Sequence, residues 1–214
     1  MFAPVPDTAA AALVFYPGGL VDPAAYAPLA RGVAEAGYRA TILTLPFRQA
    51  PLERHRTRLF ERTRAALEAD GRAVVVGGHS RGGALAAQFA RRHPEALAGL
   101  LLVGTSHPRE HDLSALDLDV TKVFGSEDGL ASEAEVRQFA PNLPASTDWV
   151  RVEGGDHAQF GWYGWQLGSG RARISREQQQ AETVRAVLGQ LARVAEAEGA
   201  SSGPPAAPGR GRPD

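Results

Sequence analysis

One short stretch of the sequence has the residue types of a nucleophile site. Residues 78–82, Gly-His-Ser-Arg-Gly, fit the pattern G-x-S-x-G between an apolar run at 73–76 and a helical pattern at 84–92. In this strand–turn–helix setting the serine hydroxyl is exposed above the sheet, and glycine neighbours let the chain bend tightly. Ser80 is therefore a candidate for acyl transfer. The alternative is an ordinary glycine-rich turn in which Ser80 only caps the helix.

A nucleophilic serine requires a histidine base and an acid that orients this base. With this turn the order along the chain is serine, acid, histidine. Asp128 and His157 each follow an apolar run typical of a strand. Both therefore belong to the carboxyl edge of a parallel sheet, where Ser80 also lies and where ligands bind. We predict a triad of Ser80, Asp128 and His157, with Glu127 as the alternative acid.

The other acids and histidines fit this order less well. Asp117 and Asp119 precede the run at 120–124, so they belong to the opposite edge of the sheet. His107 and His111 follow a strand-like run, which keeps them near the active edge as secondary candidates. The remaining histidines are expected to pack in the turn or to lie on or beside solvent-facing helices: His79, His55 and His93.

Acyl transfer also needs two N–H groups that stabilise the oxyanion of the tetrahedral intermediate. One comes from the residue after the nucleophile, Arg81, and the other from the loop after the first strand. That loop is Tyr-Pro-Gly-Gly-Leu at 16–20, and a glycine pair lets backbone approach a substrate closely. We predict Gly19 as the loop donor, with Leu20 as the second choice.

The elements that must position these residues alternate regularly between strand and helix. Such alternation is typical of βαβ units, and near-continuous apolar strands indicate burial on both faces. We predict an α/β fold, a three-layer α/β/α sandwich with about six mainly parallel strands. The expected strands are 13–16, 40–45, 73–76, 100–103, 120–124 and 148–152, and the expected helices are 28–36, 52–69, 84–92, 133–139 and 176–197.

Composition limits the domain organisation and the class of function. The 214 residues are 43% hydrophobic and 22% charged, which predicts one domain at 1–198. Residues 199–214, rich in glycine and proline, are expected to form a disordered tail. There is no cysteine, which excludes disulfides and a thiol nucleophile.

Net charge and hydropathy limit the classes of partner and the location that we expect. A net charge of −1 gives no electrostatic case for nucleic acid or an anionic membrane surface, and we expect neither as a partner. No apolar segment is long enough to span a bilayer, and the first residues lack a basic signal-peptide region. We expect a cytoplasmic protein without a cofactor or a metal. The sequence leaves the oligomeric state open.

Three stretches carry a resemblance to a known family: 15–19 with 25–30, 77–83, and 155–161 through 175. Over residues 13–191 the chain resembles the α/β-hydrolase superfamily, most closely a small capless bacterial branch related to dienelactone hydrolases. The last stretch implies that His157 is the triad histidine.

The chain also departs from this branch. Arg81 and Asp156 stand where similar proteins often have leucine and asparagine. Dienelactone hydrolases use cysteine, so this resemblance does not fix the substrate. The Arg81 cation is expected to meet an acidic substrate group or to pair with a nearby carboxylate.

The expected pocket follows from what surrounds the triad. Residues 104–119 are too few for a cap domain, which predicts a shallow, open site. Phe160, Trp162 and Tyr163 crowd the stretch after His157 and are predicted to bind substrate. The alternative is that these aromatic residues pack a surface loop onto the fold.

The predicted function is hydrolysis of a carboxylic ester of a small soluble substrate through an acyl-enzyme intermediate. A thioesterase or an amidase would use the same triad, because the pocket and not the acyl-enzyme chemistry sets that choice. A third hypothesis is a non-catalytic protein that binds a small molecule on a hydrolase scaffold.

Overall fold

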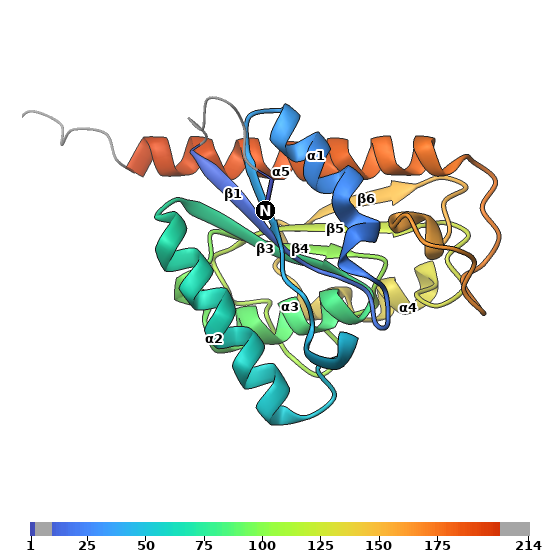
Figure 1. Cartoon of the computed structure of the whole chain (residues 1–214), viewed down its shortest axis with the longest axis horizontal. Coiled ribbons are helices and arrows are strands. Elements are labelled where there is room, and N and C mark those ends of the chain that lie inside the picture. Colours follow the sequence, from blue (N-terminus) through green and yellow to red (C-terminus); the bar gives the residue numbers. More distant parts are fainter. Residues whose placement is uncertain (3–9, 202–214) are drawn as a thin grey trace, which may run out of the picture.

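A single parallel sheet forms the centre of the computed structural model, which describes residues 1–2 and 10–201 (Figure 1). Its six strands are in the order β2-β1-β3-β4-β5-β6, and every neighbouring pair is parallel. The strands are β1 (Ala11–Tyr16), β2 (Arg39–Ile42), β3 (Ala73–His79), β4 (Gly99–Val103), β5 (Asp119–Gly125) and β6 (Asp148–Val152).

Helices cover both faces of the sheet, with α1 and α5 on one face and α2, α3 and α4 on the other (Figure 1). Within the described chain the helices are α1 (Ala27–Glu35), α2 (Glu53–Asp70), α3 (Arg81–Arg92), α4 (Glu133–Gln138) and α5 (Arg176–Ser201). Short 3₁₀ turns lie at Pro23–Tyr26, Pro46–Arg48, Pro94–Ala96, Ala140–Asn142 and Ala158–Phe160. The predicted three-layer sandwich without a cap is confirmed.

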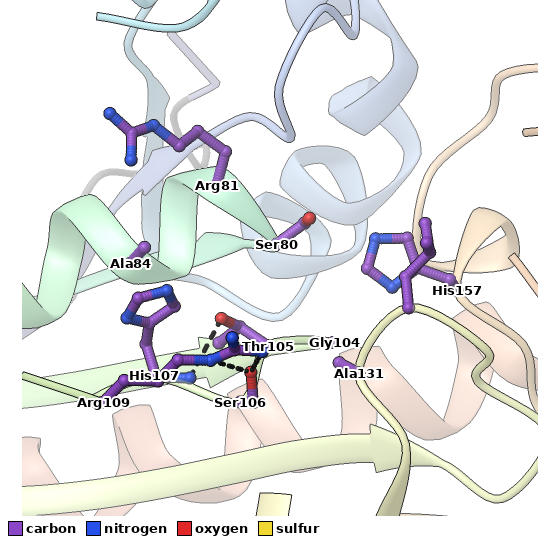
Figure 2. Close-up of a pocket in the computed structure, with 11 residues that line it drawn as sticks. Ser80, Arg81, Ala84, Gly104, Thr105, Ser106, His107, Arg109, Ala131 and His157 are labelled. Atoms are coloured by element: carbon purple, nitrogen blue, oxygen red, sulfur yellow. Dashed lines mark hydrogen bonds between the residues drawn. The ribbon is translucent and has the colours of Figure 1, made fainter. Parts of the chain in front are cut away.

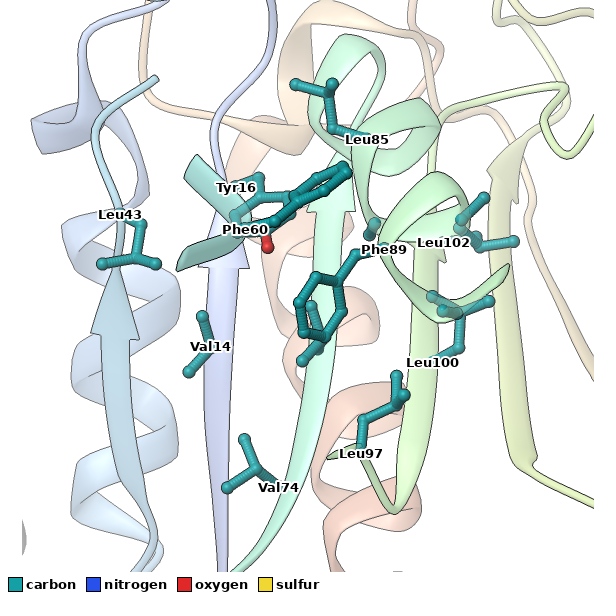
Figure 3. Close-up of a cluster of buried hydrophobic side chains, with 14 of the residues drawn as sticks. Val14, Tyr16, Leu43, Phe60, Val74, Leu85, Phe89, Leu97, Leu100 and Leu102 are labelled. Atoms are coloured by element: carbon teal, nitrogen blue, oxygen red, sulfur yellow. The ribbon is translucent and has the colours of Figure 1, made fainter. Parts of the chain in front are cut away.

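Two hydrophobic clusters hold the helices to the sheet, and β1 contributes alternate residues to each. Val14 and Tyr16 point toward α2 and α3, where they join Phe60 and Phe89 (Figure 3). Leu13 and Phe15 point to the opposite face, toward α1 and α5. Successive strand residues face opposite sides, so a strand buried on both faces must be apolar throughout. This is why the strands could be predicted from continuous apolar runs in the sequence.

Several predicted boundaries differ from the structure. The second strand ends at Ile42, and Leu43 and Leu45 enter the core from the connection that follows it. Helix α3 begins at Arg81, directly after the serine, and not at residue 84. Helix α5 continues to Ser201, so the predicted tail starts too early at 199. Its remainder, 202–214, lies outside the described residues.

A helix can span a membrane only if it is long enough and apolar enough. Across residues 1–2 and 10–201, no helix combines the length and the apolar character needed to span a bilayer.

Candidate active site

Ser80 occupies a strained turn between β3 and α3. Its backbone angles are φ 52° and ψ −115°, a region that a non-glycine residue enters only when the surrounding structure holds it there. Two glycines make this turn possible. A Cβ on Gly78 would lie 2.4 Å from the carbonyl carbon of Gly82, and one on Gly82 would lie 2.1 Å from the Tyr16 carbonyl oxygen. The turn therefore has the geometry of a nucleophile elbow.

Asp128 and His157 meet beside this serine. Nδ1 of His157 lies 2.9 Å from Oδ2 and 3.1 Å from Oδ1 of Asp128, and both side chains are buried. The backbone N–H groups of Leu130 and Ala131 donate to Oδ1 of Asp128 at 2.9 and 2.7 Å. The carboxylate accepts all of these bonds, so the imidazole donates to it from Nδ1.

The other ring nitrogen of His157 is left for the nucleophile. Among the described residues Nε2 of His157 has no hydrogen-bond partner, and Figure 2 shows the Ser80 side chain directed toward this ring. The backbone N–H of His157 donates to the Ser169 carbonyl at 3.0 Å, which fixes the loop that carries the histidine. The geometry suits a base that takes the proton of Ser80.

The alternative acids have other partners. Glu127 forms an ion pair with Arg173 at 3.4 Å. Asp119 begins β5 at the opposite edge of the sheet and pairs with Arg193 at 2.8 Å. The structure thus brings Asp128, and not these carboxylates, to His157.

His79 packs against His157, as its place in the turn predicted. It is fully buried, and its ring centroid lies 4.6 Å from that of His157. Burial, together with the neighbouring His157, holds the pKa of His79 well below its ordinary value, so the ring is neutral. Its Nδ1 lies 2.8 Å from Oη of Tyr26.

The same tyrosine hydroxyl also binds the loop after β1. The backbone N–H of Gly18 donates to Oη of Tyr26 at 2.9 Å. Burial raises the pKa of Tyr26, which keeps its proton for donation to Nδ1 of His79. Tyr26 therefore ties the loop after β1 to the turn that carries Ser80.

The structure separates the two predicted loop donors. The N–H of Leu20 donates to the Arg48 carbonyl at 2.8 Å and is already engaged. The N–H of Gly19 meets no acceptor within the described chain. A Cβ on Gly19 would lie 3.3 Å from Cβ of Arg81, so the two predicted donors are neighbours. The N–H of Arg81 lies in the first turn of α3, where N–H groups lack intrahelical partners.

The Arg81 side chain pairs with no carboxylate of the described chain, which answers one of the two expectations from the sequence. Its Nε donates to the Gln49 carbonyl at 3.1 Å and its Nη2 to the Ala50 carbonyl at 3.3 Å. Figure 2 shows the guanidinium turned away from Ser80. Desolvation, followed by the charge of Arg56, lowers the pKa of Arg81 from its ordinary value. Arg81 thus anchors the connection before α2 through backbone oxygens.

A pocket of about 280 Å³ opens beside Ser80 and His157. Its wall comes mainly from the segment after β4, with a smaller part from the loop after β5 (Figure 2). His107, kept as a secondary candidate from the sequence, lies in this wall. The lining residues that sequence reasoning missed are Ala84, Gly104, Thr105, Ser106, Arg109, Leu130 and Ala131. Except for Ala84 in α3, they follow the carboxyl ends of β4 and β5, and this position was the signal that pointed to them.

The predicted aromatic substrate contacts lie elsewhere. Phe160 is buried, and its ring packs 5.7 Å from that of His79. Tyr163 packs against the same ring at 6.4 Å, while Trp162 lies under the Arg176 guanidinium at 5.8 Å. None of the three lines the described pocket. Phe160 and Tyr163 secure the loop after His157 through this packing, whereas Trp162 remains exposed.

Comparisons with known proteins agree with this geometry. A family model described as "Alpha/beta hydrolase family" matches residues 12–181. No curated protein matches the sequence.

Several solved structures share the fold. A soluble variant of monoglyceride lipase from Saccharomyces cerevisiae is 13% identical, with a TM-score of 0.71 and 91% of each chain covered. A protein from Thermoplasma acidophilum, described as a predicted CIB-like hydrolase, is 17% identical, with a TM-score of 0.65 and 86% of this chain and 88% of that chain covered.

The RedJ thioesterase of the prodiginine pathway in Streptomyces coelicolor is 15% identical, with a TM-score of 0.60 and 87% of this chain and 90% of that chain covered. At these identities the likeness shows the fold alone.

Proposed function

Because the chain belongs to the alpha/beta hydrolase family, we propose that it is a serine hydrolase that cleaves a carboxylic ester of a small substrate. One observation carries the proposal. The Asp128–His157 pair, joined at 2.9 Å, leaves Nε2 of His157 free beside a serine in a strained turn. A glycine-rich turn that only caps a helix has no use for such a pair.

The first half of the reaction acylates the serine. Nε2 of His157 takes the Ser80 proton as Oγ attacks the ester carbonyl, and Asp128 stabilises the imidazolium that forms. The N–H groups of Gly19 and Arg81 bind the oxyanion of the tetrahedral intermediate. Each such donor contributes roughly 3–4 kcal/mol to the transition state. His157 then gives the proton to the leaving alcohol, and the acyl group remains on Ser80.

The second half releases the acyl group. His157 takes a proton from water, the hydroxide attacks the acyl carbonyl, and the same N–H groups bind the new oxyanion. Collapse of this intermediate returns the proton to Ser80 and frees the carboxylic acid. His79 stays neutral throughout, so it adds no positive charge against the imidazolium.

A fluorophosphonate probe tests the nucleophile directly. We expect covalent labelling of folded wild-type protein at Ser80, located by peptide mass spectrometry, and no labelling of Ser80→Ala. Ser126→Ala, which changes a serine in the loop after β5, serves as the matched control and keeps full labelling. Absence of labelling in the folded wild type would contradict the hydrolase and favour a non-catalytic binding protein.

A substrate panel then separates the reactions that share this triad. It consists of p-nitrophenyl esters of increasing acyl length, acyl-coenzyme A thioesters and anilides. We expect the highest kcat/KM on short esters, because a pocket of about 280 Å³ lies below the usual size range of ligand pockets. A higher kcat/KM on a thioester or an anilide would assign the site to a thioesterase or an amidase.

A further inference from the structure

The pocket wall after β4 offers hydroxyl protons that nothing in the described chain accepts. Thr105 and Ser106 line the pocket and are each 3% exposed. Oγ of Ser106 accepts from Nε of Arg109 at 2.8 Å and also from its Nη2. A hydroxyl has two lone pairs and one proton, so these bonds leave the Ser106 proton for another acceptor.

The Thr105 hydroxyl also has a proton that is free to be donated. Its Oγ1 accepts from the backbone N–H of His107 at 3.3 Å, and its proton meets no acceptor among the described residues. Both hydroxyl oxygens already accept a hydrogen bond, and each keeps a proton that it can donate. Two adjacent donors on a pocket wall therefore suit a ligand that brings acceptor atoms.

Arg109 adds a third donor to this wall. Its Nη2 also reaches Glu135 at 3.4 Å, but both side chains of this ion pair are about 40% exposed, at 40% and 43%. Ion pairs of this kind are weak. Nη1 of Arg109 has no acceptor in the described part of the chain. The guanidinium is held by Ser106 and lies 5.7 Å above the ring of Phe139, which orients it in advance.

The charges around this wall are positive. Burial lowers the pKa of His107 to about 4, and the charges that lower it further belong to Arg109, Lys122, Arg81 and His111. The His107 ring is therefore neutral at pH 7, and the guanidinium groups of Arg109 and Arg81 are the permanent cations that act on it. Glu135 is a carboxylate that contacts Arg109.

We propose that Thr105, Ser106 and Arg109 form a subsite for a carboxylate on the substrate. The inference rests on the proposed hydrolase function and names its substrate class, short esters that carry a second, ionised acid group. A carboxylate accepts from a guanidinium and from two hydroxyls, and these charge-assisted bonds are the strong ones. Ala84, Leu130 and Ala131 supply the apolar part of the pocket lining, which the carbons between the ester and the acid would contact.

Pairs of esters that differ only in charge test the subsite. One pair is p-nitrophenyl hydrogen glutarate and p-nitrophenyl pentanoate, with the charge on the acyl side. The other is 4-acetoxybenzoate and its methyl ester, with the charge on the leaving group. We expect wild-type kcat/KM to favour the charged member of one pair, and the favoured pair identifies the side that enters the subsite.

Variants assign this preference to Arg109. We expect R109Q to lower the charged-to-neutral ratio of kcat/KM roughly 10- to 100-fold, the effect of losing a charged hydrogen-bond donor. R109K keeps the charge without the planar fork and should give an intermediate ratio. R185Q, an exposed arginine of α5 on the far face of the sheet, is the matched control and should leave the ratio unchanged. Equal rates within both pairs, or an unaltered ratio in R109Q, would overturn the subsite.

Binding to the Ser80→Ala variant separates this proposal from the hydrolase function. Calorimetry with the intact charged and neutral esters reports the subsite without turnover. Tighter binding of the charged ester, lost on adding R109Q, supports the subsite even where wild type hydrolyses nothing. Hydrolysis of charged and neutral esters at equal rates would remove the subsite and leave the hydrolase standing. Absence of both binding and hydrolysis would remove both.

Discussion

Two loops flank Ser80 on either side of β3, and they present their hydrogen-bond donors in different ways. The loop after β1 offers a backbone N–H, that of Gly19, and is fixed by Tyr26 and by the Leu20–Arg48 backbone bond. The segment after β4 offers side chains, of which Ser106 and Arg109 support each other. In the sheet, β3 lies between β1 and β4, so these two loops lie on opposite sides of the nucleophile.

Backbone donors and side-chain donors suit different tasks, the stabilisation of the oxyanion and the selection of the substrate. An oxyanion is common to every acyl transfer, so backbone donors at fixed positions serve any substrate. A second group on the substrate varies from one compound to another, and side chains can match it without changing the fold. On the proposed function, we expect the loop after β1 to govern kcat and the segment after β4 to govern which ester is preferred.

The largest expected effect is a loss of kcat on changing the predicted triad, which lies between the two loops. Asp128→Asn leaves His157 without its carboxylate and favours the wrong tautomer, so kcat should fall about 10⁴-fold. Steady-state kinetics on p-nitrophenyl acetate measures the loss. Glu127→Gln, at the neighbouring position, is the matched control and should stay within a few-fold of wild type. A similar loss in both variants would contradict the assignment of Asp128.

The next effect tests the loop after β1 without altering a side chain. Replacing Gly19 by glycolic acid exchanges its N–H for an ester oxygen and removes one oxyanion donor. We expect kcat to fall about 10²- to 10³-fold with little change in KM. The corresponding α-hydroxy acid at Leu20 removes an N–H that binds Arg48 and should lower stability more than kcat. The reverse pattern would make Leu20 the donor.

A smaller effect is expected where Tyr26 joins the loop after β1 to the turn of Ser80. Tyr26→Phe leaves the Gly18 N–H and Nδ1 of His79 without their partner. Buried groups left unpaired cost roughly 1–3 kcal/mol, which chemical denaturation measures. We also expect kcat to fall severalfold as the loop loosens. Tyr38→Phe is the control, because the Tyr38 hydroxyl makes no hydrogen bond within the described chain. Equal stability of the two variants would argue against the tie.

The smallest effect concerns the support beneath the segment after β4. Lys122 is buried, and its Nζ donates to the His107 carbonyl. Desolvation by burial, followed by the charge of Arg109, lowers the pKa of Lys122 to about 7. The unfolded chain therefore binds one proton more than the folded chain between about pH 7 and pH 10, and the Lys122 contribution makes stability rise with pH.

Lys122→Met removes this contribution. Between pH 7 and pH 9 the wild type should gain free energy of unfolding relative to the variant, by at most about 1.4 kcal/mol per pH unit. Urea denaturation of both proteins across this range gives the difference. Parallel stability curves would show that Lys122 keeps its charge in the folded protein.

Much of the fold and the reactive centre was predictable from the sequence. The glycines around Ser80 could be recognised in the sequence because a tight turn requires them. At Gly82 the backbone of β1 is so close that no side chain fits. Asp128 and His157 were predictable from their position after strands, because parallel strands deliver their carboxyl ends to one edge. The pocket was less predictable. The aromatic residues Phe160 and Tyr163 turned to the core, and Arg109 is one of many arginines with no local pattern to mark it.

The sequence by itself determined the order of elements, the absence of a thiol nucleophile and the choice of Ser80, Asp128 and His157 as the candidate triad. These depend on local periodicity, glycine positions and the rule that joins strands in parallel. Only the tertiary structure decided that Arg81 turns to backbone carbonyls and that Arg109 enters the pocket. The direction of a long, flexible side chain depends on partners distant in the sequence, and chain order does not encode which of them are near.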